Sequence, residues 1–197
     1  MSALLSCPER PEGQQGWGEW TKRLRLSPWC SLVFEFAVCL NVLMIGQLTE
    51  FRIKSEPRGP AFEALLNYCT DVGLSGSLVD RFPSSRKGRD ARERFLQLIR
   101  PQLMGIEAVT GWPGTSEQGA TPLMRFSLDK MLVSSLSELA KGLYQFHSPN
   151  LPEDLAVYRA DGSVLLGSVA HEHLGWMLLS DAERADNRLG LVDTPAP

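Results

Sequence analysis

Apolar positions recur at helical spacing in several stretches of the chain, and the longest apolar run covers residues 27–51. Ser27 is a favourable helix N-cap, and Pro28 suits the first helical position, where its missing N–H is not needed. We therefore predict a helix over residues 28–44. The following LTEFRIK alternates between apolar and polar residues, which favours a strand over residues 48–54. Periodicity alone does not assign such an apolar run, so one helix over residues 28–54 is the alternative.

The predicted helix is apolar on nearly every side, a pattern found in protein cores and in membranes. Glu35, Asn41 and Gln47 interrupt the run. A carboxylate in the middle of a membrane helix costs about 2.5–3.5 kcal/mol on insertion scales, so the pattern favours a core element that buries Phe36. Residues 1–16 are polar and contain prolines and glycines, and they lack the basic and apolar regions of a secretory signal.

Two further helices are predicted downstream. Pro60 opens a run with helical spacing that Gly73 is suited to end. Ser127 is a natural N-cap for a longer helix that ends at residues 148–150. The apolar face of this longer helix is made of Leu128, Leu132, Leu136, Leu139, Leu143 and Phe146. Between the two helices, residues 105–126 contain four glycines and two prolines, so we expect a long irregular loop that Trp112 ties down.

The last third of the chain changes character. Two short β-type runs flank residues 160–163, where Asp161-Gly162 is a strong hairpin signal. A third strand is expected from Trp176 to Leu179, and an acidic tail follows.

Together these elements predict an α+β fold with a mainly helical N-terminal two-thirds and a small antiparallel C-terminal β-hairpin or sheet. The expected organisation is a flexible N-terminus (1–16), a mainly helical core (17–150), a hairpin region of the same domain (151–181) and a flexible tail (182–197). A chain of 197 residues is long enough for one large domain.

Composition excludes few function classes. The net charge of −3 is too small to indicate a nucleic-acid or membrane partner. The cysteines, at positions 7, 30, 39 and 69, form no CxxC pair and have no metal-ligand spacing. We therefore expect four reduced thiols in a cytoplasmic protein that needs no cofactor.

Residues 81–100 are the exception in charge. They contain seven basic and two acidic residues, a net charge of +5. Because the whole chain has a net charge of −3, the other residues sum to −8. The segment has an apolar helical face made of Ala91, Phe95, Leu98 and Ile99, and Pro101 ends the predicted helix. The simplest interpretation is a solvated helix. One functional alternative is a docking face for an acidic protein. A nucleic-acid phosphate backbone is a less favoured partner, because few aromatic residues lie among the basic ones.

Catalytic and metal-binding patterns are weak. His171 and His173 would share one face if they lay on a strand, but a catalytic zinc site needs three protein ligands. The glycines in GLSGS (73–77) lack the following GK[ST] of a phosphate-binding loop. No metal site is therefore expected. If the protein is an enzyme, its polar site must assemble from dispersed residues, and the candidates are Glu35, His147, His171, Glu172 and His173.

The hypothesis we carry forward is a non-enzymatic, bacterial-type binding protein that occludes a protein partner, as immunity proteins and antitoxins do. Two surfaces are candidates for the contact. One is the basic segment with Arg86, Arg89 and Arg92, and the other is the C-terminal hairpin with Asp161, Glu172 and Trp176. Because toxins that attack nucleic acid tend to have basic clefts, the acidic hairpin side is favoured, with Trp176 as aromatic anchor. The competing hypotheses are the enzyme described above and a nucleic-acid regulator that uses residues 81–100.

Overall fold

A computed structural model describes residues 48–185 and 192–195 of the chain, which belong to one compact unit. The elements in chain order are β1 (Thr49–Ile53), α2 (Pro60–Val72), β2 (Ser75–Val79), α3 (Arg86–Ile99), β3 (Leu103–Trp112), β4 (Thr115–Ser127), α4 (Lys130–Leu139), η2 (Leu143–Gln145), β5 (Glu153–Tyr158), β6 (Val164–Val169), η3 (Ala170–Glu172), β7 (Leu174–Leu179), α5 (Asp181–Arg184) and β8 (Val192–Pro195). The predicted helix over 28–44, with Glu35 and Phe36, lies outside the described residues.

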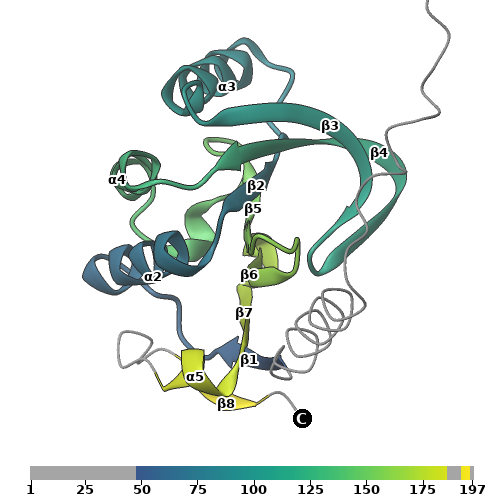
Figure 1. The fold of residues 1–197 in the computed structure, drawn as a ribbon. Coiled ribbons are helices and arrows are strands. Elements are labelled where there is room, and N and C mark those ends of the chain that lie inside the picture. Colours follow the sequence, from purple (N-terminus) through teal and green to yellow (C-terminus); the bar gives the residue numbers. More distant parts are fainter. Residues whose placement is uncertain (1–47, 186–191, 196–197) are drawn as a thin grey trace, which may run out of the picture. The chain divides into compact units, whose positions relative to one another are not determined.

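The strands form one eight-stranded sheet in the order β3-β4-β2-β5-β6-β7-β1-β8. Every neighbouring pair is antiparallel. Helices α2, α3 and α4 cover one face of this sheet, and α3 lies at the end of the helix layer nearest β3 (Figure 1). The fold is therefore α+β, but the predicted division into a helical N-terminal two-thirds and a small C-terminal sheet is wrong, because strands run through the whole described region.

The prediction failed mainly at residues 105–126, which form a long hairpin of β3 and β4 and not an irregular loop. Its glycines and prolines occupy positions where a strand tolerates them. Gly105 and Gly119 have open space where a side chain would begin, and Pro113-Gly114 makes the turn, with Gly114 at φ 82°. Pro122 lies beside the end of β2, so its missing N–H interrupts few hydrogen bonds between the strands.

Three predicted helices are present, with changed ends. Helix α2 begins at Pro60 as expected, and α3 follows the predicted apolar face of the basic segment. Helix α4 begins two residues later than predicted because Asp129, and not Ser127, caps it by accepting a hydrogen bond from the Leu132 N–H at 2.7 Å. It ends at Leu139, whose side chain is 42% exposed, so its assignment to the buried face was wrong.

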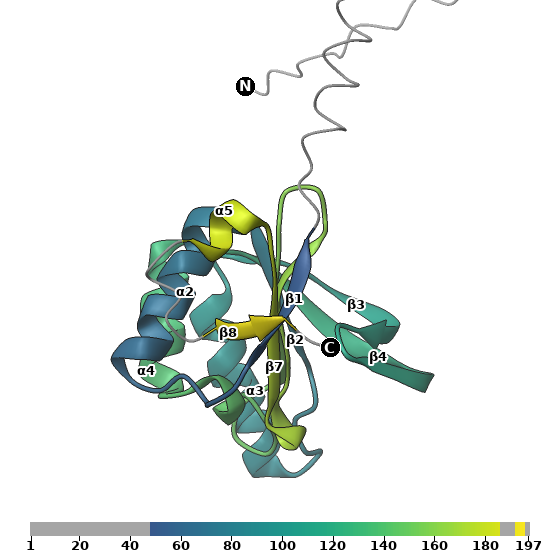
Figure 2. The same ribbon diagram turned by 90° about the horizontal axis from the view of Figure 1, so that it is seen from below.

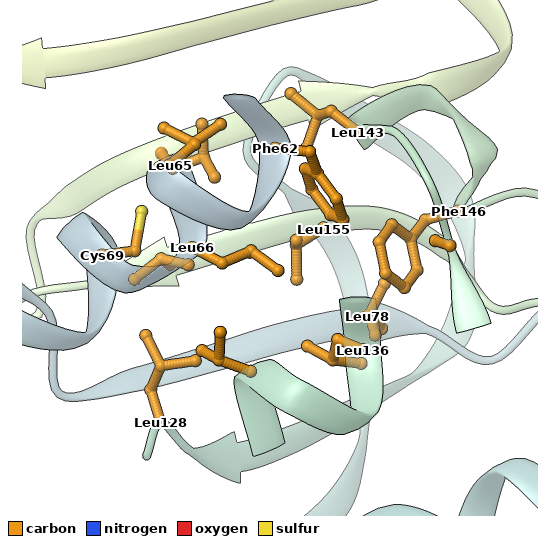
Figure 3. Close-up of a cluster of buried hydrophobic side chains, with 14 of the residues drawn as sticks. Phe62, Leu65, Leu66, Cys69, Leu78, Leu128, Leu136, Leu143, Phe146 and Leu155 are labelled. Atoms are coloured by element: carbon orange, nitrogen blue, oxygen red, sulfur yellow. The ribbon is translucent and has the colours of Figure 1, made fainter. Parts of the chain in front are cut away.

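The main core lies between the helix layer and the sheet. Figure 3 shows side chains from α2, α4 and the strands meeting there, and the labelled residues are Phe62, Leu65, Leu66, Cys69, Leu78, Leu128, Leu136, Leu143, Phe146 and Leu155. Leu136 is fully buried, as predicted from its position on the helix. The predicted strand over 48–54, the β5–β6 hairpin and the third strand near Trp176 are confirmed.

A second, smaller cluster lies on the face of the sheet that the helices leave uncovered. Figure 2 shows the β3–β4 hairpin projecting to this side. Trp112, at the end of β3, packs with Val79 and Leu123, and its indole Nε1 donates to Asp154 Oδ2 at 2.8 Å. The other carboxylate oxygen of Asp154 accepts from the Ala170 N–H at 2.8 Å. Trp112 therefore ties this segment down, as its sequence position suggested.

Within the described residues, no helix is both long and apolar enough to cross a bilayer.

The thiol of Cys69 gives a test of the core. It is fully buried and free, and burial raises its pKa to about 12, with a smaller opposing effect from Arg159. Because the thiolate is the reactive form, iodoacetamide at pH 8 should modify Cys69 at least about a hundredfold more slowly in the native protein than in urea. The measurement uses a variant in which Cys7, Cys30 and Cys39 are serine, so that a single thiol reports. Comparable rates in the two states would contradict the burial of this side chain.

Candidate protein-binding surface

Helix α3 is fixed at its start by local interactions. Ser85 caps it by accepting the Gly88 N–H at 3.1 Å. Gly88 is required there because a side chain at this position would meet the Pro83 carbonyl oxygen at 2.1 Å. The buried face of the helix then consists of Gly88, Ala91, Phe95 and Ile99. Leu96 and Leu98 are partly buried against the same core, and the exposed positions of α3 lie on the opposite side.

The outward positions of α3 and its last turn are mostly basic. Five cationic side chains are exposed, and they belong to Arg86, Lys87, Arg89, Arg94 and Arg100. The exposed acidic residues of the same segment are Asp90 and Glu93. Within the described residues, Arg86, Arg94 and Arg100 form no ion pair with a carboxylate. The excess positive charge predicted from the sequence is therefore displayed on the surface.

The three predicted arginines of this segment have different roles. Arg92 is half-buried, and its Nη2 lies 2.6 Å from Oδ2 of Asp80, so its charge is used inside the fold. A hydrogen bond to Asp80 raises the pKa of Arg92 further. Arg89 donates to the Ser84 carbonyl oxygen next to the helix start. Arg86 and Arg89 remain exposed, and Arg94, which the sequence did not single out, joins them.

A groove of about 300 Å³ runs between α3 and the end of α4. Its lining residues are Ala91, Arg94, Phe95, Leu98, Leu139, Asn150 and Leu151. The floor is apolar, and Arg94 and Asn150 supply the polar groups. The groove was missed at the sequence level because Leu139 had been assigned to the core. The early end of α4, followed by Ala140 in extended conformation, is what leaves Leu139 at the surface.

The second predicted surface is not brought together. Asp161 lies in the turn between β5 and β6, and Glu172 lies in η3 after β6. The six residues of β6 separate these two sites by roughly 20 Å, at about 3.3 Å per residue. The Asp161 carboxylate accepts the Ser163 N–H at 2.9 Å and the Ser163 hydroxyl at 2.7 Å, and these bonds lower its pKa. Asp161 therefore organises its turn and stands apart from Glu172.

Trp176 lies on β7, on the face opposite the helices. Its ring is packed so closely against Gly167 and Gly114 that a side chain at either glycine would meet it within 2.4 Å. It also lines a hollow of about 240 Å³ beside Glu50 and Arg52. Trp176 is half-buried, so its position fits a covering role for the sheet better than that of a projecting anchor.

The four candidate enzymatic residues that the structure describes, His147, His171, Glu172 and His173, are exposed. His171 and His173 do not lie on a strand, since His171 is in η3 and His173 is its left-handed C-cap at φ 55°. The His173 ring lies 5.4 Å from the Tyr144 ring, and His147 Nδ1 lies 2.7 Å from the Ser148 carbonyl oxygen. No three His, Cys, Asp or Glu side chains in the described parts of the chain group together as metal ligands. Glu35 lies outside these parts.

The two glycines in 73–77 both have structural positions. Gly73 ends α2, and its N–H donates to the Cys69 carbonyl oxygen at 2.7 Å. Gly76 lies in β2, a central strand that pairs with β4 and β5. Gly76 is small because a side chain there would meet the Phe126 ring at 2.3 Å.

A comparison of the chain with protein-family models, with curated proteins and with solved structures finds no match.

Proposed function

We propose that the protein binds and occludes a protein partner, in the manner of immunity proteins and antitoxins, and that α3 and the α3–α4 groove form the contact surface. The observation that carries this proposal is the apolar groove bordered by Arg94 and continuous with the exposed basic face of α3. The partner's contact surface should then be acidic around at least one projecting apolar side chain.

The two halves of this surface supply different contributions. Full burial of one leucine-sized side chain in a groove stabilises a complex by about 1.5–3 kcal/mol. The surrounding charges mainly accelerate association and exclude partners of the wrong sign. Leu98 and Leu139 offer the apolar contact, while Arg86, Arg89 and Arg94 supply the charge.

A protein partner fits this surface better than nucleic acid does. Single-stranded nucleic acid is typically held by exposed aromatic side chains together with basic residues. The two aromatic residues of this segment are turned inward, because Phe95 is 3% exposed and its ring centroid lies 6.4 Å from that of Phe82. The apolar side chains on the groove floor also cannot form hydrogen bonds or ion pairs with phosphates.

The proposal predicts which variants lose affinity. The partner is recovered from the native host on the immobilised full-length chain, identified by mass spectrometry, produced recombinantly and titrated by calorimetry. Replacing Arg86 and Arg94 together by glutamate should weaken binding about a hundredfold, the scale of two moderate hot-spot contacts. The fold should persist, because neither arginine is ion-paired to a described carboxylate and an acid at the helix start is favourable.

Glu172→Lys is the matched control, since it reverses one exposed charge on the other candidate surface. It should leave affinity within about twofold. The proposal fails if Glu172→Lys abolishes binding while the double α3 variant binds normally. It also fails if the purified chain retains oligonucleotides and no protein.

A further inference from the structure

Strand β3 forms an edge of the sheet. It has β4 on one side and no strand on the other within residues 48–185 and 192–195. It is ten residues long, and Met104 and Ile106 are 68% and 42% exposed. Proteins usually protect such edges with lysine, proline or very short strands, but LMGIEAVTGW contains neither residue and has one charge, Glu107. That carboxylate is paired with Arg125 at 2.7 Å.

The register shows which backbone groups of β3 face outward. The Asp80 N–H donates to the Pro122 carbonyl oxygen at 2.9 Å, so the backbone groups of Pro122 point toward β2 and away from β3. Ala108, which pairs with Pro122, is therefore in a non-hydrogen-bonded pair, and its N–H and C=O point to the free side. The same holds two residues earlier for Ile106, which pairs with Met124.

Helix α3 sets the charge beside this edge. Its last turn leads into β3 through residues 100–102, and it is the helix nearest β3 (Figure 1). Arg100, at the start of this connection, is exposed. A segment added along β3 would therefore run past a positively charged helix, and carboxylates on its helix-facing side would be favoured.

The same charges disfavour a second copy of the chain as the occupant. Two β3 strands paired around a two-fold axis perpendicular to the sheet would place both copies of α3 on the same face, next to the junction. Each helix region exposes five cations, so this pairing brings like charges together.

We infer that the β3 edge binds an extended, acidic segment of the protein partner by β-strand addition, with the outward N–H and C=O groups of Ile106 and Ala108 pairing to it. Main-chain hydrogen bonds supply affinity in this mode, and alternate side chains supply specificity. The inference rests on the proposed function and adds to the groove contact a second one, formed by backbone groups.

The test uses a synthetic peptide as the probe. An eight-residue peptide with blocked ends alternates valine or threonine with glutamate, and the control peptide has lysine in place of glutamate. The full-length ¹⁵N-labelled chain is titrated with each peptide by NMR. The acidic peptide should shift the amide resonances of Ile106 and Ala108 and slow their hydrogen exchange, and the lysine peptide should bind at least about tenfold more weakly.

Two substitutions at one position isolate the backbone contribution. Ala108→Pro removes an outward donor without removing a β3–β4 hydrogen bond, and edge strands tolerate proline on that side. It should weaken peptide binding about tenfold or more, while Ala108→Thr, which keeps the N–H, should stay within about threefold. Unchanged α3 and β4 resonances in the proline variant confirm that the fold persists.

The outcomes separate this inference from the proposed function. If the acidic peptide shifts α3 and groove resonances but not those of β3, the edge inference is wrong and the groove proposal stands. If the acidic peptide shifts neither region at concentrations up to millimolar, the edge inference is wrong. The calorimetric titration with the partner then tests the groove proposal by itself. A wild-type dimer in sedimentation that Ala108→Pro dissociates would assign the edge to a second copy and overturn the inference.

Discussion

Replacing Asp154 by alanine should lower the free energy of unfolding by about 3 kcal/mol. The Asp154 side chain is 1% exposed and accepts two hydrogen bonds, from Trp112 Nε1 and from the Ala170 N–H. Each buried donor left without an acceptor costs about 1–3 kcal/mol. Asp154 also has φ 58°, a conformation that aspartate tolerates better than alanine does. Loss of the desolvation cost of the carboxylate offsets part of this total.

The measurement is denaturant unfolding followed by circular dichroism. Trp112→Phe is the matched control, because it removes one of the two hydrogen bonds and keeps an aromatic ring beside Val79 and Leu123. It should cost about 1–2 kcal/mol and leave the Ala170 bond intact. Equal stabilities of Asp154→Ala and wild type would show that the hairpin end is not held by this carboxylate.

This link explains why the β3–β4 hairpin was difficult to predict. Trp112 was identified as an anchor, but its acceptor is 42 residues further along the chain and belongs to another strand. Sequence periodicity reports the environment of one segment at a time, so it does not show such a partner. The unusual backbone of Asp154 is equally invisible, because aspartate occurs in many conformations.

Elements with strong local signals were predicted well. Pro60 marks the start of α2, the alternation in 48–54 marks β1, and Asp161-Gly162 marks the β5–β6 turn. Strand β2 was missed because SGSLV begins with small residues, which the structure explains by the close approach of Phe126 to Gly76. The edge strand β3 was missed because few of its side chains are buried, and burial is what produces alternation.

The candidate site was predicted in part. The positive charge of α3 follows directly from its sequence, and most of its arginines are displayed. The groove depends on where α4 ends, and the free edge depends on the order of strands in the sheet. Both are consequences of long-range pairing, in which β2 lies between β4 and β5 and leaves β3 outermost.

Helix α4 offers a pair of leucines that separates stability from binding. Leu136 is 0% exposed and packs in the main core, whereas Leu139 is 42% exposed and lines the α3–α4 groove. Leu136→Ala should lower the free energy of unfolding by about 2–5 kcal/mol, because it removes apolar contacts and leaves a cavity. Leu139→Ala makes the same chemical change, but it should cost less than about 1 kcal/mol, since much of this side chain already meets water.

The effects of the two substitutions on affinity for the partner should be in the reverse order of their effects on stability. The folded Leu136→Ala protein keeps the groove and should bind the partner with nearly wild-type affinity. Leu139→Ala removes an apolar contact that the partner would bury, so its dissociation constant should rise about tenfold, which corresponds to about 1.4 kcal/mol. Calorimetric titration at a temperature where both variants are folded gives the comparison. If Leu139→Ala instead destabilises the protein as much as Leu136→Ala and leaves affinity unchanged, then Leu139 belongs to the core, as its helical spacing first indicated, and the groove is not the contact.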